Sequence, residues 1–263
     1  MNLNGKTAWI TGASSGIGEA TARALFQAGA SVILSARSAN KLESLQKELD
    51  PERKRSLVVP LDLADYNNLD SAVSTVQKQY GKVDYLVNNG GISQRSLARD
   101  ASLSSVEQIF KVNALGTIAL TTAAFSMIQP SGRIITVTSV TGRFGTPLRS
   151  SYSATKHALH GYFDSMRAEQ KATGPGVSLI VPGFVNTSVS INALTSDGSA
   201  QGTMDPSTGS GLPPEAVARA ILKAIRKGKD EIVIAGGKER FGLMLKRFAP
   251  GLLNRILAKS AVT

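Results

Sequence analysis

The chain alternates short, almost wholly apolar runs with segments of helical periodicity, and this rhythm restricts the fold more than any other feature. Helical patterns such as 17–28, 39–49 and 69–80 separate the runs. Strands that helices cover on both faces are apolar along most of their length. We therefore predict an α/β protein with a seven-stranded parallel sheet and helices on both faces. The seven predicted strands are 6–11, 31–36, 56–61, 83–87, 133–138, 177–181 and 231–235.

The amino-acid composition suits one folded unit and excludes several kinds of site. Hydrophobic residues make up 42% of the 263 residues and charged residues only 19%, which favours a large core and argues against disorder. The sequence contains no cysteine, which excludes disulfides, thiolate metal ligands and cysteine nucleophiles. With only two histidines, we expect no metal site.

A glycine-rich segment follows the first predicted strand and opens a helical pattern. Residues 12–18 read Gly-Ala-Ser-Ser-Gly-Ile-Gly, so the glycines are spaced G-x-x-x-G-x-G. Glycines here let the backbone turn tightly and approach a pyrophosphate, which the free N–H groups of the helix N-terminus bind. A simple glycine-rich turn is the alternative for the loop taken alone. The segment predicts a doubly wound Rossmann fold with dinucleotide contacts at Gly12, Ser14, Ser15, Gly16, Ile17 and Gly18.

The same segment also satisfies G-x-S-x-G, the pattern around the nucleophile of α/β hydrolases. A hydrolase of this kind requires an acid and then a histidine on a loop after a late strand. The only histidines, His157 and His160, lie within a helical pattern. We therefore reject a hydrolase.

The end of the second predicted strand indicates which dinucleotide binds. An NAD site places Asp or Glu about 20 residues beyond the glycines, on the ribose 2′-hydroxyl. This region reads Ser35-Ala36-Arg37-Ser38 and has no carboxylate. The Arg37 guanidinium suits a 2′-phosphate, and Ser38 adds a hydroxyl donor. We predict NADP (NADPH) in preference to NAD, with an ordinary exposed arginine as the alternative for Arg37.

Three side chains suited to carbonyl chemistry follow the fifth predicted strand. Ser139 ends this strand, at the edge where ligands bind in open α/β sheets. Tyr152 and Lys156 are four residues apart and share one face of a predicted helix. A neighbouring ammonium lowers the pKa of a tyrosine, so Tyr152 could exchange a proton with a carbonyl oxygen that Ser139 holds. Tyr and Lys at this spacing are, taken alone, usually part of a solvated face.

Together these motifs resemble the short-chain dehydrogenase/reductase family in its single-domain form. The usual N-N-A-G is changed at Gly90, which we expect only to loosen the backbone. The resemblance implies an oxidoreductase that transfers a hydride between NADP(H) and a small carbonyl or alcohol substrate, and it implies a homo-oligomer. The matching motifs are TGASSGIG at 11–18, Asp62, NNGG at 88–91, Asn113, Ser139, YSATK at 152–156 and PGFVNT at 182–187.

The resemblance also implies roles for single residues. Ser139, Tyr152, Lys156 and Asn113 match the catalytic positions. Tyr152 is implied to be the acid or base, Lys156 to bind the nicotinamide ribose, and Asn113 to hold a water of the proton relay. A helix-packing asparagine is the alternative for Asn113. Besides Tyr152 and Lys156, the positions that match cofactor contacts are Asp62, Leu63, Asn89, Gly90, Pro182, Gly183, Val185 and Thr187.

Substrate contacts are predicted on and near one long loop. The segment 186–212 is rich in Ser, Thr, Gly and Asn, and in the family a segment at this place is a substrate lid. We expect Gln94, Phe144 and Phe184 to line the pocket beside Ser139, although the two phenylalanines could equally be core residues. The competing function is a nucleotide-sensing protein that has kept the fold and lost turnover.

Basic charge is concentrated at the C-terminal end. Residues 219–263 contain eleven Lys or Arg and three Asp or Glu, within a net charge of +11. We assign residues 1–237 to the dinucleotide-binding and catalytic domain and 238–263 to a basic amphipathic extension, which Pro250-Gly251 divides into two helices. Its apolar face packs on the core or on a partner subunit, or alternatively rests on an anionic membrane surface. No motif indicates nucleic-acid binding.

The N-terminal residues lack the apolar core of a secretory signal, and no stretch reaches the length of an uninterrupted apolar membrane span. The nearest candidate, 114–128, is interrupted by Gly, Ser and Thr and is typical of a buried helix. We therefore expect a cytoplasmic protein, with peripheral contact at a membrane surface as the alternative.

Overall fold

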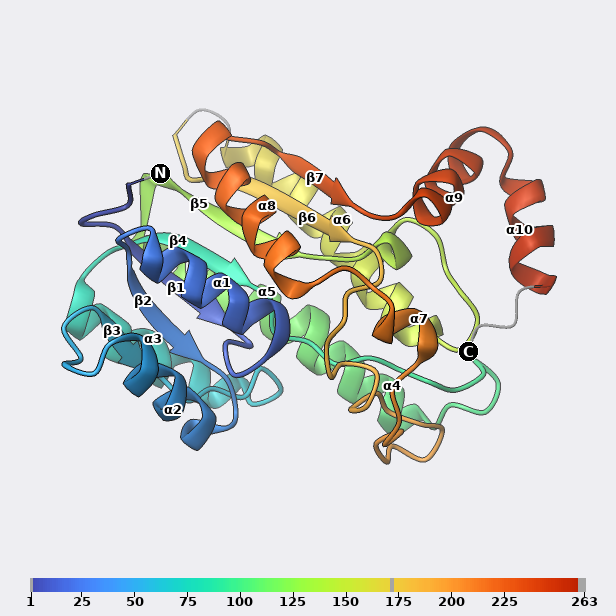
Figure 1. The fold of residues 1–263 in the computed structure, drawn as a ribbon, viewed down its shortest axis with the longest axis horizontal. Coiled ribbons are helices and arrows are strands. Elements are labelled where there is room, and N and C mark those ends of the chain that lie inside the picture. The colour runs from blue at the N-terminus through green and yellow to red at the C-terminus, as the bar shows by residue number, and fades with distance from the viewer. Residues whose placement is uncertain (1, 171–172, 260–263) are drawn as a thin grey trace.

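A seven-stranded, all-parallel sheet forms the centre of the molecule (Figure 1). The computed structural model describes residues 2–170 and 173–259, without the side chains of residues 66 and 67. The strand order is β3-β2-β1-β4-β5-β6-β7. Successive strands are added toward one edge of the sheet up to β3 and toward the other edge from β4 on, so the order reverses between β1 and β4. The strands are β1 (Thr7–Thr11), β2 (Ser31–Ser35), β3 (Ser56–Val58), β4 (Val83–Asn88), β5 (Ile128–Val137), β6 (Gly176–Pro182) and β7 (Glu231–Ile234). This confirms the predicted doubly wound fold.

Two helical layers cover the sheet, and the alternation along β1 shows why. Ala8 and Ile10 point into one hydrophobic cluster, whereas Trp9 points into the other. The first cluster holds the apolar faces of α1, α2 and α8, and the second holds those of α3, α5, α6, α9 and α10. The helices are α1 (Gly16–Gln27), α2 (Ala39–Leu49), α3 (Tyr66–Tyr80), α4 (Leu103–Phe110), α5 (Gly116–Ala124), α6 (Ser150–Gln170), α7 (Pro206–Gly209), α8 (Pro214–Lys227), α9 (Gly237–Phe248) and α10 (Pro250–Lys259).

Two strands differ from their predicted bounds by more than one residue at an end. β3 ends at Val58 rather than at residue 61, because Pro60 has no N–H to donate to the sheet. The amides of Val59 and Leu61 nevertheless donate to Leu34 and Ala36, so the extended pairing continues beyond the strand. β5 begins five residues earlier than predicted, at Ile128, which pairs with Val83 across a register shift.

Contrary to the prediction, one stretch is long and apolar enough to cross a membrane. Among the described residues, the helical run Leu103–Met127 passes this test by length and composition. Half of its most apolar window is buried, and α4 and α5 pack against α6 and α3. It has the packing of a core helix, as the sequence indicated for 114–128.

The C-terminal extension forms two helices that meet at Ala249 and Pro250, as predicted, and residues 260–263 lie outside the described part. Leu245 and Leu253 are buried against the same cluster as α6, so the extension belongs to the body of the fold. α9 and α10 lie beyond β7 at the right of the view (Figure 1). These two helices carry five exposed large apolar residues, which we call the apolar ridge: Phe241, Met244, Phe248, Leu252 and Ile256.

Candidate active site

A cleft of about 660 Å³ opens at the carboxyl edge of the sheet. Ligands bind at this edge in open α/β sheets, beside the point where the strand order reverses. The cleft is lined by residues that lie within four positions after the ends of six strands, so the topology alone brings distant parts of the sequence together. These residues include Gly12 after β1, Arg37 after β2, Asp62 after β3, Asn89 after β4, Ser139 after β5 and Gly183 after β6.

The glycine-rich loop turns tightly and packs against the first turn of α1, as a pyrophosphate-binding loop does. Gly12 has φ +66°, a left-handed conformation that side chains disfavour. A Cβ on Gly18 would lie 2.1 Å from the Gly12 carbonyl oxygen, so this position in the first turn of α1 accepts glycine alone. All of the predicted loop contacts line the cleft except Gly18, which packs behind the loop. The loop therefore fits a dinucleotide, and Gly18 supports the shape of the loop from outside the cleft lining.

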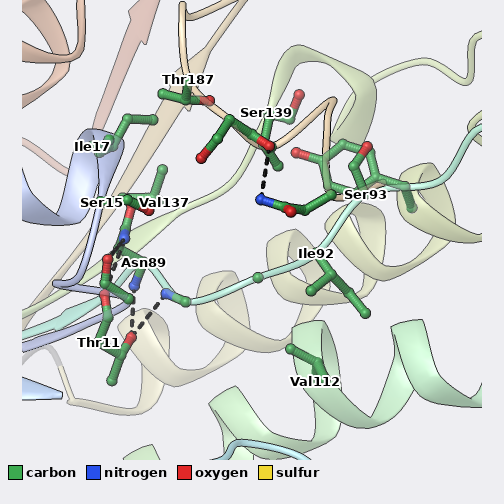
Figure 2. Close-up of a pocket in the computed structure, with 18 of the residues that line it drawn as sticks. Thr11, Ser15, Ile17, Asn89, Ile92, Ser93, Val112, Val137, Ser139 and Thr187 are labelled. Atoms are coloured by element: carbon green, nitrogen blue, oxygen red, sulfur yellow. Dashed lines mark hydrogen bonds between the residues drawn. The ribbon is translucent and has the colours of Figure 1, made fainter. Parts of the chain in front are cut away.

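The Thr11 side chain fixes the end of β4 beside this loop (Figure 2). Its hydroxyl accepts hydrogen bonds from the amides of Asn89, at 3.0 Å, and Gly90, at 2.9 Å. The Asn89 side chain in turn donates to the Thr11 carbonyl at 3.0 Å. The sequence analysis gave Thr11 no role, although a threonine that ends a strand beside a glycine loop is well placed to bind loop amides.

Arg37 and Ser38 are exposed at the other end of the cleft, where α2 begins. Asp62 lies near them, and its carboxylate accepts a hydrogen bond from the Ala64 amide at 2.9 Å. Lys41 also lines this end and adds a second basic side chain that the sequence analysis did not single out. Leu63, Gly90, Pro182, Gly183, Val185 and Thr187 line the cleft as well, so each predicted cofactor contact except Gly18 does so.

Ser139, Tyr152 and Lys156 converge in the middle of the cleft. The Ser139 hydroxyl lies close enough to Tyr152 to lower the pKa of the phenol, and it accepts a bond from the Thr141 hydroxyl at 3.0 Å. The Lys156 ammonium lies 5.6 Å from the centre of the Tyr152 ring and donates to the Val137 carbonyl at 3.0 Å. The three predicted side chains are therefore brought together, and Thr141 is an additional residue that orients Ser139.

The electrostatics around Tyr152 differ from the prediction. Burial raises the pKa of Tyr152, and the Ser139 hydrogen bond and the charges of Arg149 and Arg95 oppose this rise. Burial also lowers the pKa of Lys156 to about 8. Lys156 is thus itself partly neutral near pH 8, and arginines rather than the lysine provide the charges that act on the phenol. The prediction that Lys156 lowers the pKa of Tyr152 is not met in this structure, because burial dominates both groups.

Asn113 lies behind the cleft wall rather than in it. It sits in a single π-helical turn, Lys111–Leu115, between α4 and α5, and it is fully buried. Its amide oxygen accepts from the Ile92 amide, and its nitrogen donates to the Ile92 carbonyl, both at 2.8 Å. A third bond joins it to Thr155 at 3.2 Å. Asn113 therefore ties the loop after β4 to α6, the helix that carries Tyr152.

Two residues expected to contact substrate lie outside the cleft lining: Gln94, and Phe144, for which a core position was the stated alternative. Gln94 is fully buried, and its side chain accepts from the Ser151 amide at 2.7 Å in the first turn of α6, so it caps this helix. Phe144 lies in the hydrophobic core, where its ring packs on Gly242 of α9. Neither residue lines the cleft, whereas Phe184 does. The loops that carry Gln94 and Phe144 reach the site, but both side chains turn inward to satisfy helix and core contacts.

The predicted lid segment 186–212 forms part of the cleft wall. Its residues Thr187, Val189 and Asn192 line the cleft, and it pairs with the loop after β4 through the Leu194 amide and the Ser93 carbonyl at 2.9 Å. The segment also contains α7 and, at the residue before α7, Asp205. The carboxylate of Asp205 binds Arg95 and Arg149, two cleft residues that the sequence analysis missed because neither belongs to a motif.

Known proteins resemble this chain over nearly its whole length. A family model described as short chain dehydrogenase matches residues 6–197. A "Dehydrogenase/reductase SDR family protein 7-like" of Anopheles gambiae is 41% identical, covering 99% of this chain and 84% of the relative. A "Dehydrogenase/reductase SDR family member 7B" of Danio rerio is 38% identical and covers 99% and 87% respectively.

Solved structures share the fold. A short-chain dehydrogenase/reductase from Burkholderia phymatum in complex with NAD superposes with a TM-score of 0.83 at 22% identity, covering 96% of each chain. An alcohol dehydrogenase from Thermococcus sibiricus complexed with 5-hydroxy-NADP gives 0.75 at 26% identity, covering 87% of this chain and 95% of the other. Since the family model spans most of the sequence and the relatives match nearly all of it, the chain belongs to the short-chain dehydrogenase/reductase family of oxidoreductases.

Proposed function

We propose that the protein is an NADP-dependent reductase of a small carbonyl compound, or the corresponding alcohol dehydrogenase, with Tyr152 as the acid or base. The observation that carries this proposal is the contact of Ser139 with Tyr152 in the open cleft, with Lys156 beside the phenol ring. When bound, the nicotinamide cofactor would supply the hydride for the carbonyl carbon. The chain supplies the proton and the groups that hold the reacting oxygen.

In this reaction, the Tyr152 hydroxyl gives its proton to the substrate oxygen while the Ser139 hydroxyl donates a hydrogen bond to the same oxygen. The amide and the hydroxyl of Thr141 both donate to the Ser139 oxygen. The hydroxyl hydrogen of Ser139 therefore remains available for the substrate oxygen. The positive charges of Arg149 and Arg95 then stabilise the phenolate that remains. In the opposite direction, the phenolate takes the proton of the alcohol.

The raised pKa of Tyr152 favours the reduction over the oxidation. Because burial raises this pKa, the phenol is protonated at neutral pH and is ready to donate. Oxidation of an alcohol requires the phenolate, which the unliganded site disfavours.

The preference for NADP rests on the groups after β2. Arg37 and Ser38 are exposed at the cleft, residues 35–38 contain no carboxylate, and Lys41 adds positive charge. A 2′-phosphate is bound well by such groups, whereas the ribose diol of NAD would lack its usual acidic acceptor.

Replacement of Tyr152 tests the acid or base. We expect Tyr152→Phe to lower the kcat for an accepted ketone by about 10²- to 10⁴-fold, the usual contribution of a positioned acid. The affinity for NADPH, measured by fluorescence titration, should change by less than about threefold because the ring remains. Tyr162→Phe removes a hydroxyl from the same helix outside the cleft and serves as the matched control.

A panel of aldehydes, aliphatic ketones, quinones and steroid-like ketones separates the enzyme from the nucleotide sensor. Turnover by the wild type that disappears in Tyr152→Phe supports the enzyme. If the wild type binds NADPH tightly, reduces no compound of the panel and behaves like Tyr152→Phe, the sensor function replaces the proposal.

A further inference from the structure

Two buried arginines and one carboxylate form a cluster in the part of the cleft around Ser139 and Tyr152, which we call the substrate half. The side chains of Arg95, Arg149 and Asp205 are 8%, 5% and 8% exposed. Arg95 follows β4, Arg149 immediately precedes α6, and Asp205 belongs to the lid segment. Both arginines line the cleft, and Arg149 stands three residues before Tyr152.

The hydrogen bonds of the cluster leave one buried nitrogen, the Arg149 Nη1, without an acceptor among the described residues. Arg95 bonds the Asp205 carboxylate through Nε at 2.7 Å and through Nη2, and its Nη1 donates to Ser93 and to the Gln94 carbonyl. Arg149 reaches the same carboxylate through Nη2 at 3.3 Å. The Arg149 Nη1 is buried and has no hydrogen-bond partner in the part of the chain that the structure describes. Buried donors are rarely left without an acceptor, because the lost hydration costs about 1 to 3 kcal/mol.

The positive charge of the cluster is also not fully neutralised. Two guanidiniums share one carboxylate, so the cluster carries a net positive charge away from bulk water, and burial lowers the pKa of Arg149 to about 10. Among the described residues that line the cleft, Asp62 is the only carboxylate. It follows the edge strand β3, whereas Ser139 follows β5 on the other side of β1. Nothing acidic in the cleft wall near Tyr152 therefore balances the excess charge.

The backbone and a neighbouring ring hold Arg149 in this place. Leu148, just before it, has φ +62°, a left-handed conformation that costs a leucine free energy and that recurs at ligand sites. The Ser96 amide donates to the Leu148 carbonyl at 3.2 Å and so ties this turn to the loop of Arg95. The Arg149 guanidinium also lies over the Phe184 ring, 5.5 Å from its centre.

We propose that Arg149, supported by Arg95, is an oxyanion-binding subsite, and that the carbonyl substrate of this protein carries an anionic group such as a carboxylate. One oxygen of this group accepts the free N–H of Arg149 and neutralises the cluster, since guanidinium N–H groups match such oxygens well. The lid carboxylate of Asp205 holds the two arginines in position and at the same time weakens their pull on the substrate. This inference rests on the proposed function and deepens it, because it names the substrate class.

The test is a series of aryl keto acids with two to six carbons between ring and carboxylate, each paired with its methyl ester. The series is needed because the subsite fixes the charge but not the length of the substrate. We expect the wild type to prefer at least one acid over its ester by about 10- to 100-fold in kcat/KM, which is the usual effect of a hydrogen bond to a charged group. The readout is the kcat/KM for the acid divided by the kcat/KM for its ester, measured within each variant. A general loss of activity lowers both values and cancels in this ratio.

Two variants should move this ratio in opposite directions. Arg149→Met should bring it close to one, because the donor is lost. Asp205→Asn should raise it by at least about threefold, because the competing charge is removed while an amide of the same shape remains. Misfolding cannot produce this pair of results, since damage would lower both. Arg99→Met replaces an exposed arginine on the same loop and should leave the ratio unchanged.

The outcomes separate the inference from the proposed function. If the esters are reduced as well as the acids, or if the preference survives Arg149→Met, the oxyanion subsite is wrong while the reductase stands. If no compound is reduced, calorimetric titration of the same pairs into the NADP⁺-saturated protein still decides the question. An acid that binds more tightly than its ester only when Arg149 is present supports the subsite, and equal or absent binding overturns it.

Discussion

The two halves of the cleft are built in different ways. The cofactor half consists largely of backbone and small residues: glycines after β1 and a threonine that binds the amides after β4. The substrate half consists of long side chains from three distant segments, joined by the Arg95–Asp205–Arg149 cluster. The shape of the cofactor half is set by close backbone contacts within a short stretch of chain, the glycine loop after β1. The substrate half depends on contacts that only the folded lid creates.

The largest effect should come from breaking the steric limit of the cofactor half. A methyl group in Gly18→Ala would lie 2.1 Å from the Gly12 carbonyl oxygen, so the loop must shift away from the pyrophosphate. We expect the affinity for NADPH to fall at least about 100-fold, because several backbone hydrogen bonds to the phosphates are misplaced together. Fluorescence titration with NADPH measures this loss.

Gly161→Ala is the matched control for Gly18→Ala. A Cβ on Gly161 meets nothing within 4 Å on the surface of α6, so this variant should bind NADPH normally and unfold at an equal or higher temperature. Normal binding by Gly18→Ala would show that the close approach within the loop is not what the cofactor half depends on.

The second effect concerns the charge at the outer end of the cofactor half. Arg37→Glu should weaken NADPH binding about 10- to 100-fold, through loss of a charge-assisted contact and repulsion of the 2′-phosphate. The affinity for NADH should stay the same or improve, since a carboxylate here suits a ribose diol. Lys47→Glu on the exposed side of α2 makes the same charge change as a control. Equal losses for NADPH and NADH would refute the assignment of Arg37.

The same contrast explains how far the sequence could predict the site. The glycine spacing, Arg37, Ser139, Tyr152 and Lys156 follow strand ends or share a helix face, so local patterns suffice to bring them to one edge of the sheet. The parallel sheet and its two helical layers follow from the same alternation, whereas the order of the strands comes from the structure. Local patterns cannot decide which way a loop side chain turns, which is why Gln94 was wrongly placed in the pocket and Phe144 was left between pocket and core.

The arginine cluster was missed for a related reason. Arg95 and Asp205 are 110 residues apart in sequence, and each alone looks like an ordinary loop charge. Their burial becomes evident only when the lid segment is placed over the loop after β4. The raised pKa of Tyr152 could not be predicted either, because it depends on how completely the folded chain excludes water from the phenol.

A smaller effect should appear where the two halves meet, at Lys156. Its pKa of about 8 means that the folded protein holds the ammonium below this pH and releases the proton above it. An anionic cofactor favours the charged lysine, so NADPH affinity should fall as the pH rises from 7 to 9, by up to about 10-fold. Lys156→Arg stays charged over this range and should give a flat profile. A slope that persists in this variant would assign the titration to another group.

The smallest effect concerns the outer boundary of the substrate half, where α9 contacts the cleft: Glu239 accepts a hydrogen bond from the Phe184 amide at 3.4 Å. The exposed apolar ridge on α9 and α10 stands among basic residues, and this combination favours an anionic lipid surface. The double variant Met244→Ser and Phe248→Ser should bind phosphatidylserine-containing vesicles about threefold less in flotation, since only part of each side chain would leave water.

Point changes on the ridge are better than truncation at Gly237, which would also remove Glu239 and the buried Leu245. Leu103→Ser alters an equally exposed apolar residue on α4 and should not affect flotation. If the wild type ignores the vesicles but sediments as a dimer that the double variant loses, a second copy of the chain covers the ridge instead. The substrate half would then border a subunit interface, which α9 would connect to the cleft through Glu239.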